Sequence, residues 1–191
     1  ERFISSEEVF EQDLRNAIEK KEFEMYLQPQ YNVVDKRICG CEMLIRWNNP
    51  KYYHQSPARF IELAETNNLI IPLAKFINEE SMRIAKLLEQ YNIEVSLNVS
   101  PVQILQAGFV NELVELAKQY EVNPSNIALE ITETFLMENF DAVNAKLKLL
   151  QGYGFKIHLD DFCTGYSSML YLKELPINSI KIDKEFTRFL N

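Results

Sequence analysis

The feature that most constrains the fold is a regular alternation between two kinds of segment from about residue 56 onward. Segments with apolar residues at helical spacing are separated by short apolar runs that are typical of buried strands. The predicted strands cover 94–99, 127–131, 155–159 and 179–182, and helical segments are predicted from 56, over 72–91, 110–120, 141–150 and 184–190, with a shorter turn near 168–172. This alternation predicts βα units around a parallel sheet, and so an α/β protein.

The beginning of the chain follows a different pattern. Residues 5–8 (Ser-Ser-Glu-Glu) form a helix-start signature, and 1–21 is predicted to be a leading helix. Segments 23–34 and 38–47 have an extended pattern, with a turn at 35–36 (Asp-Lys) between them. Strands so close in sequence are expected to be antiparallel. The chain therefore predicts six strands, of which the first two are antiparallel.

Composition limits the class of protein. The chain has 191 residues with 47% hydrophobic content, enough for one sizeable core and short for two, so 1–191 is predicted to be one domain. A net charge of -8 argues against a polymeric nucleic acid as partner, although bound cations would still permit a phosphate-bearing ligand. Cys39, Cys41 and Cys163 have neither disulfide-framework nor zinc-site spacing.

The expected location is the cytoplasm. A chain without a disulfide framework suits a reducing compartment, and the sequence has no signal peptide and no apolar run near transmembrane length. Because the chain opens on Glu1 rather than Met, we expect it to be a piece of a longer protein. The segment is then cytoplasmic in its own right or the cytoplasmic part of a larger or membrane-bound protein.

Polar side chains interrupt or follow several of the predicted strands. Asp160 and Asp161 directly follow one apolar run, and Glu42, Asn98 and Glu130 each lie in or at the end of another. Taken alone, an aspartate pair is slightly more typical of a turn or a helix start than of a functional site. Oxygen ligands that converge from several strand ends are what a divalent metal site needs. The recurrence therefore favours a metal site over a turn.

Structural alternatives exist for each of these residues. Glu42 and Arg46 share one strand face, where they could form an ion pair, or serve as a metal ligand and a phosphate clamp. Lys181 could pair with Asp183 or face the clustered acids and orient an attacking water. Asn98 could be a hydrogen-bonded core residue or a metal ligand through its carbonyl oxygen. Together they suit metal-assisted phosphoester cleavage.

Five stretches, in order, resemble the motifs of EAL domains. These stretches are 41–47 (Cys-Glu-Met-Leu-Ile-Arg-Trp), 97–101 (Leu-Asn-Val-Ser-Pro), 130–134 (Glu-Ile-Thr-Glu-Thr), 160–168 (Asp-Asp-Phe-Cys-Thr-Gly-Tyr-Ser-Ser) and 181–183 (Lys-Ile-Asp). EAL domains are bacterial cyclic di-GMP phosphodiesterases built on a TIM-like (β/α) barrel with an antiparallel first strand. The resemblance covers essentially the whole chain and implies this fold and this activity.

The resemblance also implies a two-metal site. Glu42, Asn98, Glu130 and Asp160 would bind one Mg²⁺ or Mn²⁺, and Asp160 with Asp161 would help hold a second. Metal-activated hydroxide would then attack one phosphodiester of cyclic di-GMP in line and give linear pGpG. The alternative is a catalytically degenerate EAL domain that binds cyclic di-GMP or a protein partner without cleaving it.

Further roles follow from the same resemblance. Lys181 would contact the nucleophilic water, while Gln28 and Arg46 would contact the dinucleotide. Glu133 would support the loop 162–168, which in this family links metal binding to dimerisation, although a glutamate there is also a good first residue of a helix. We therefore expect a homodimer, with room for sensor or signalling domains before the segment.

The chain departs from the family pattern at three places. Met43 replaces the alanine of the family name, and Cys163 replaces a glycine after the two aspartates, where a positive φ would strain a cysteine. The family's seventh and eighth strands, with a further glutamate ligand and a glutamine, have no counterpart up to Asn191. We therefore expect a barrel that lacks its last two strands.

Overall fold

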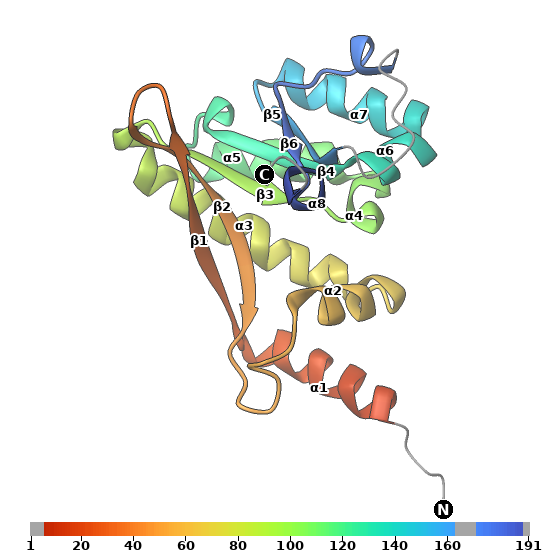
Figure 1. The fold of residues 1–191 in the computed structure, drawn as a ribbon. Coiled ribbons are helices and arrows are strands. Elements are labelled where there is room, and N and C mark those ends of the chain that lie inside the picture. The colour runs from red at the N-terminus through yellow and green to blue at the C-terminus, as the bar shows by residue number, and fades with distance from the viewer. Residues whose placement is uncertain (1–5, 163–170, 189–191) are drawn as a thin grey trace, which may run out of the picture.

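The protein is described by a computed structural model that covers residues 6–162 and 171–188. Its strands form one sheet in chain order (Figure 1). They are β1 (Phe23–Asn32), β2 (Arg37–Trp47), β3 (Glu94–Asn98), β4 (Ile127–Thr132), β5 (Lys156–Phe162) and β6 (Ser179–Ile182). The α-helices are α1 (Ser6–Lys20), α2 (Pro57–Thr66), α3 (Ile70–Leu88), α4 (Pro101–Leu105), α5 (Phe109–Gln119), α6 (Glu133–Glu138), α7 (Phe140–Gly152) and α8 (Lys184–Thr187).

The sheet has the predicted topology. β1 and β2 are antiparallel, with Phe23 opposite Trp47, and every later neighbour is parallel. α-Helices connect β2 to β3, β3 to β4 and β4 to β5, as crossover connections require. Within the described residues the sheet stays open, with β1 at one edge and β6 at the other. This is the wall of a (β/α) barrel with an antiparallel first strand, and it confirms the predicted fold class.

Strand alternation divides the sheet into an apolar and a polar face. Leu97, Leu129 and Ile157 lie in neighbouring strands and are at most 1% exposed, because they pack in the core between the sheet and the helices. Their neighbours in sequence, including Asn98 and Glu130, lie on the other face of the sheet. The apolar face anchors the strands to the helices and leaves the barrel interior for polar groups.

A second core joins the leading helix to the sheet. Aromatic residues at the ends of β1 and β2 pack against α1 and α2, with Trp47 stacked on Tyr52 at 4.4 Å and next to Phe10 and Phe60 at 5.7 and 5.9 Å. Figure 1 shows α1 beneath the end of the hairpin, where this cluster lies. The core fixes the end of β2, from which Arg46 projects.

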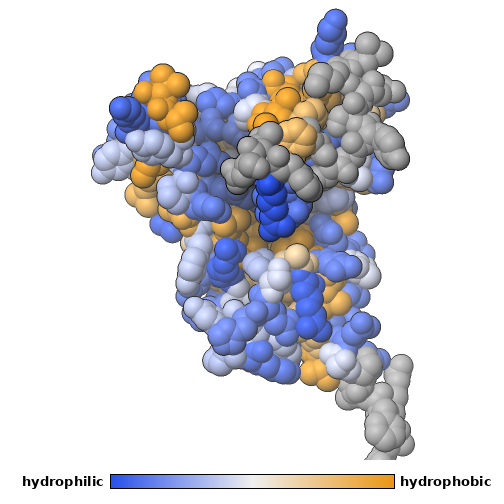
Figure 2. Space-filling model, in the orientation of Figure 1, coloured by the Kyte–Doolittle hydropathy of each residue, from blue (hydrophilic) through white to orange (hydrophobic). Residues whose placement is uncertain are grey.

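None of the described helices is long and apolar enough to cross a membrane. The described surface has an exposed apolar patch at one end of the sheet. Figure 2 shows an apolar patch over the turn between β1 and β2, where Val33 and Val34 are 79% and 84% exposed. This turn lies at the opposite end of β2 from Trp47, and therefore far from the carboxyl ends of the parallel strands.

Some boundaries differ from the sequence prediction. The short helix α4 was not predicted, because it is too brief to show a helical period; it begins at Pro101, after Ser100 caps it by accepting from the Val102 amide at 3.2 Å. Helix α6 begins at Glu133, in agreement with the helix start considered for that residue. Helix α3 begins at Ile70, ahead of Pro72. Strand β5 continues through the aspartate pair to Phe162. Of the turn predicted at 168–172, positions 168–170 lie outside the described residues.

We predict that Leu129→Ala lowers the free energy of unfolding by about 3 kcal/mol, because Leu129 is fully buried in the central strand β4 and its loss leaves a cavity. Leu149→Ala makes the same chemical change on the surface of α7, where the side chain is 57% exposed, and should cost less than about 0.5 kcal/mol. Urea unfolding followed by circular dichroism measures both. Equal losses in the two variants would contradict this account of the core.

Candidate active site

Polar side chains gather on the inner face of the sheet at the carboxyl ends of the parallel strands. In the register of the sheet, Asn98 of β3 lies beside Glu130 of β4, and Thr132 of β4 lies beside Asp160 of β5. Registered residues in neighbouring strands point to the same face. The sheet therefore brings the predicted ligands together from separate segments of the chain.

Lys181 lies at the centre of this cluster. Its Nζ is 2.9 Å from Glu42 Oε2 and 3.3 Å from Asp160 Oδ2, and it also pairs with Glu130 Oε2. These four residues come from β2, β4, β5 and β6. Asn98 Nδ2 donates to the other oxygen of Glu42 at 2.9 Å. One ammonium group thus joins three carboxylates from three other strands.

The structure decides two of the alternatives that the sequence left open. Lys181 does not pair with Asp183, whose side chain instead caps α8 by accepting from the Glu185 amide at 2.6 Å. Among the described residues, Glu42 pairs with Lys181 and no ion pair joins it to Arg46. Neither local pairing forms, and the alternative that Lys181 faces the clustered acids is confirmed.

Burial and charge act together in the cluster. Burial by itself would lower the pKa of the Lys181 ammonium, but hydrogen bonds with Glu130 and Glu42 outweigh it and raise that pKa above its ordinary value. Glu130 is 1% exposed, so burial raises the pKa of its carboxyl, and the hydrogen bond from Lys181 offsets part of that rise. The buried acid therefore depends on a cation beside it.

Asp161 has an unusual backbone. Its φ is 53°, in the left-handed region that aspartate tolerates better than most residues, and its amide donates to Asp160 Oδ1 at 2.9 Å. The pairing of β5 with β6 shifts register between Leu159 and Phe162, so the aspartate pair forms a bulge. Burial, and then the charge of Asp160, raise the pKa of the Asp161 carboxyl. The pair is thus both a backbone irregularity and part of the acid cluster.

The other predicted site residues lie around the cluster. Gln28 is opposite Glu42 in the β1–β2 register. The Arg46 guanidinium donates to the Ile45 carbonyl at 2.8 Å and lies 5.7 Å from the centroid of the Tyr26 ring. Gln28 and Arg46 thus lie on the wall formed by β1 and β2.

Two predicted features concern the segment after β5. Glu133 is the first residue of α6 and is 4% exposed. Of the loop 162–168 that it is predicted to support, only Phe162 lies within the described residues. Cys163 lies outside them too.

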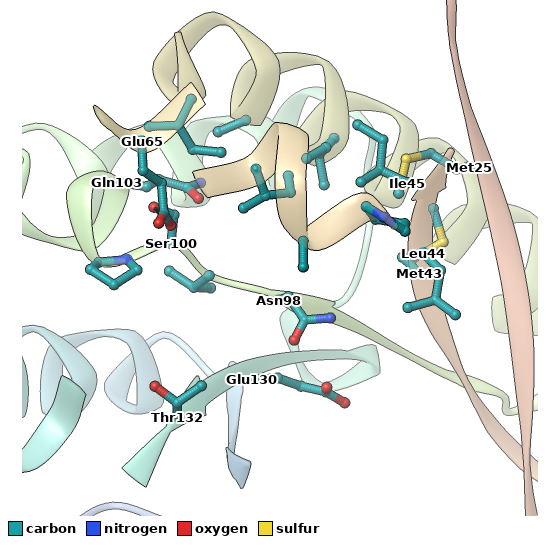
Figure 3. Close-up of a pocket in the computed structure, with 18 of the residues that line it drawn as sticks. Met25, Met43, Leu44, Ile45, Glu65, Asn98, Ser100, Gln103, Glu130 and Thr132 are labelled. Carbon is teal, nitrogen blue, oxygen red and sulfur yellow. Dashed lines mark hydrogen bonds between the residues drawn. The ribbon is translucent and has the colours of Figure 1, made fainter. Parts of the chain in front are cut away.

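A cavity of about 400 Å³ opens beside the acid cluster. Figure 3 shows Asn98 and Glu130 extending from neighbouring strands on one side of it, with the apolar side chains of Met43 and Ile45 on another. Glu65 of α2 also lines the cavity and accepts from Ser100 Oγ at 2.6 Å. No local sequence signal marks Glu65, because its role comes only from this contact between distant elements.

The chemistry of the cluster fits a divalent cation. Carboxylate and amide oxygens are typical ligands of Mg²⁺, and Glu130 Oε1 is buried without a hydrogen-bond donor among the described residues. As they stand, no three acidic, histidine or cysteine side chains in the described part of the chain form a group that could hold an ion, and Lys181 Nζ lies between the carboxylates. An ion would therefore have to replace the Lys181 ammonium between these carboxylates.

Known proteins share this sequence and fold. The sequence is 35% identical over 179 residues to the bifunctional diguanylate cyclase/cyclic di-GMP phosphodiesterase MucR of Pseudomonas aeruginosa. This alignment covers 91% of this chain and 26% of MucR. It is 34% identical to the probable cyclic di-GMP phosphodiesterase PdeG of Escherichia coli, over 100% of this chain and 38% of PdeG. The chain thus spans about a quarter of the length of the first curated relatives it matches.

A solved structure of the MucR phosphodiesterase in complex with cyclic di-GMP has the same fold. It superposes with a TM-score of 0.89 at 34% sequence identity, over 94% of this chain and 74% of that one. The sequence model of the EAL domain matches residues 11–191. The resemblance of the five motifs is therefore confirmed, and this chain belongs to the EAL domain family.

Proposed function

We propose that this chain is the phosphodiesterase domain of a bacterial signalling protein and hydrolyses cyclic di-GMP to linear pGpG with the help of divalent metal ions. The observation that carries the proposal is the convergence of Glu42, Glu130 and Asp160 on one point from three strands, with Lys181 from a fourth. Relatives named as cyclic di-GMP phosphodiesterases support the choice of substrate.

Each member of the site has a task in this reaction. Glu42, Asn98, Glu130 and Asp160 would hold one Mg²⁺ or Mn²⁺, and Asp161 would help Asp160 hold a second. When bound, such an ion supplies a hydroxide nucleophile near neutral pH and neutralises charge on the phosphodiester. Adding water across one P–O bond opens the ring and leaves a free hydroxyl and a terminal phosphate.

The chain's cations and amides would position the substrate. Arg46 would clamp a phosphate, since a guanidinium can make two parallel hydrogen bonds to it, and Gln28 would contact the dinucleotide from β1. Lys181, displaced from the carboxylates by a metal ion, would hold the attacking water by a hydrogen bond. Glu133 would support the loop after β5.

One observation favours the alternative of a domain that binds cyclic di-GMP or a protein partner without cleaving it. Lys181 occupies the middle of the acid cluster, and among the described side chains no ready group of three ligands is formed. A lysine held there permanently would keep a metal ion out. The hypothesis of an active phosphodiesterase requires that the substrate or the metal ion displace the Lys181 side chain.

The remaining expectations are part of the same proposal. They are a single domain over 1–191 with a leading helix at 1–21, a homodimer, a cytoplasmic location, and sensor or signalling domains before the segment. Relatives that are much longer than this chain support the expectation of further domains.

We predict that the protein at its full natural length converts cyclic di-GMP to pGpG in Mg²⁺ or Mn²⁺, and that Asp160→Asn lowers kcat at least about a hundredfold, because metal assistance contributes several kcal/mol. Asp141→Asn is the matched control: Asp141 is exposed at the start of α7 and should leave kcat unchanged. Chromatography of the nucleotide products measures both. Tight nucleotide binding with no metal-dependent pGpG would instead establish the non-cleaving alternative.

We also predict that Lys181→Met destabilises the protein in a chelator by about 3 kcal/mol, because the buried Glu130 loses its counter-charge. Excess Mn²⁺ should restore much of this loss, since an ion that binds only the folded state stabilises it. Lys118→Met, which removes an exposed lysine paired with Glu115, should cost less than about 1 kcal/mol with or without Mn²⁺. Urea unfolding measures all four conditions. A loss that Mn²⁺ leaves unchanged would argue against a cation site.

A further inference from the structure

The helix α4 follows the site residue Asn98 almost directly. Only Val99 and Ser100 lie between them, and the helix itself is short, Pro101–Leu105. A helix of this length is unstable alone, because almost all of its terminal N–H and C=O groups lack partners within it. Contacts with other elements must therefore set the position of α4, and with it the position of the turn that carries Asn98.

The first turn of α4 is held by an acid from α2. Ser100 caps the helix by accepting from the Val102 amide at 3.2 Å, and its hydroxyl donates to Glu65 Oε1 at 2.6 Å. This length is typical of a hydroxyl that donates to a carboxylate, which is a stronger bond than one between neutral groups. Glu65 thus joins the end of α2 to the beginning of α4.

The far end of α4 is held independently. Lys146 of α7 donates to the carbonyl oxygens of Ile104 and Gln106, at 2.7 Å each. The Ile104 side chain is also fully buried in the core. Loss of the contact with Glu65 would therefore leave α4 attached to the protein and would loosen mainly the turn at its beginning.

That turn continues the candidate cation site. Asn98 donates through Nδ2 to Glu42 at 2.9 Å, and Figure 3 shows its amide oxygen on the side of Glu130. Both acids belong to the site. Because Ser100 is only two residues further along the chain, a shift of Ser100 also moves the backbone that carries Asn98. The hydrogen bond from Ser100 to Glu65 therefore restrains the direction of the Asn98 amide.

Glu65 has two simpler alternative roles. It lines the cavity of about 400 Å³, where it could contact the nucleotide directly. A carboxylate repels a phosphodiester, however, and one oxygen of Glu65 already accepts from Ser100. The second alternative is that this hydrogen bond only stabilises the fold. A stabilising role and a positioning role differ in their effect on metal affinity, which an experiment can measure in the folded protein.

We propose that Glu65 is a positioning residue of the candidate cation site. Through its hydrogen bond with Ser100 it fixes the turn after β3, and so directs the Asn98 amide oxygen toward a bound divalent cation. The inference rests on the proposed function, because it assumes that this site takes such a cation. Glu65 itself contacts neither the cation nor the nucleotide.

The test uses the protein at its full natural length with Glu65→Ala, Glu65→Gln, Ser100→Ala and the double variant Glu65→Ala/Ser100→Ala. Glu62→Ala is the matched control, since Glu62 is exposed on the same helix. Calorimetric titration with Mn²⁺ alone measures the Kd for Mn²⁺. Product formation at saturating Mn²⁺ gives the KM for cyclic di-GMP, and thermal melting checks that each variant is folded.

Glu65→Ala and Ser100→Ala should each raise the Kd for Mn²⁺ about tenfold, as is usual when a group that orients a metal ligand is lost. Because both changes remove the same hydrogen bond, the double variant should bind Mn²⁺ about as well as either single variant. Glu65→Gln keeps an acceptor for the Ser100 hydroxyl and should behave like the unmodified protein, as should Glu62→Ala. The KM for cyclic di-GMP should not change.

Three results would overturn this inference alone, each beside an unmodified protein that binds Mn²⁺. A folded Glu65→Ala with a lower melting temperature but an unchanged Kd for Mn²⁺ would establish a purely structural role. A raised KM with an unchanged Kd would place Glu65 on the nucleotide. Fully additive effects in the double variant would show that Glu65 does not act through Ser100. If the unmodified protein neither binds Mn²⁺ nor cleaves cyclic di-GMP, the proposed function fails and this inference fails with it.

Discussion

The pairing of one lysine with three carboxylates is the interaction on which the rest of this structure depends. Glu130 is almost completely buried, and such a charge is tolerated in an interior only beside a compensating cation. Lys181 supplies that cation from the edge strand β6 and contacts acids on β2, β4 and β5. The pairing therefore draws strands from both ends of the sheet around one point. It also holds the acids close together, as a site for divalent cations requires.

The two faces of the sheet have different roles in this arrangement. One face packs against the helices with fully buried residues such as Leu97 and Leu129, which supply the apolar packing of the strands. The other face holds the acids at the strand ends, and β5 has a bulge at Asp160 and Asp161, where Asp161 has a φ of 53°. A second core around Trp47 fixes the end of β2. Apolar packing and the polar cluster thus lie on separate faces of the same strands.

The sequence predicted much of this fold because its strong signals are local. Apolar runs marked all six strands, and an acid that interrupts such a run marked Glu42 and Glu130. What it missed depends on distant contacts or on brief elements. For Lys181 the sequence left open whether it pairs with Asp183 or faces the clustered acids, because its partners are 21 to 139 residues away in sequence. Gln55 lies in a polar segment with no motif, and only the folded chain shows that its side-chain oxygen is buried without a donor among the described residues.

The central claim is that the carboxylates around Lys181 form a site for divalent cations on the path to hydrolysis. Anomalous diffraction from crystals grown with Mn²⁺ and cyclic di-GMP tests it most directly. The account predicts a manganese peak among Glu42, Glu130 and Asp160, with the Lys181 ammonium displaced toward the scissile phosphate. A structure with the nucleotide bound, Lys181 still among the carboxylates and no manganese between them would contradict the claim.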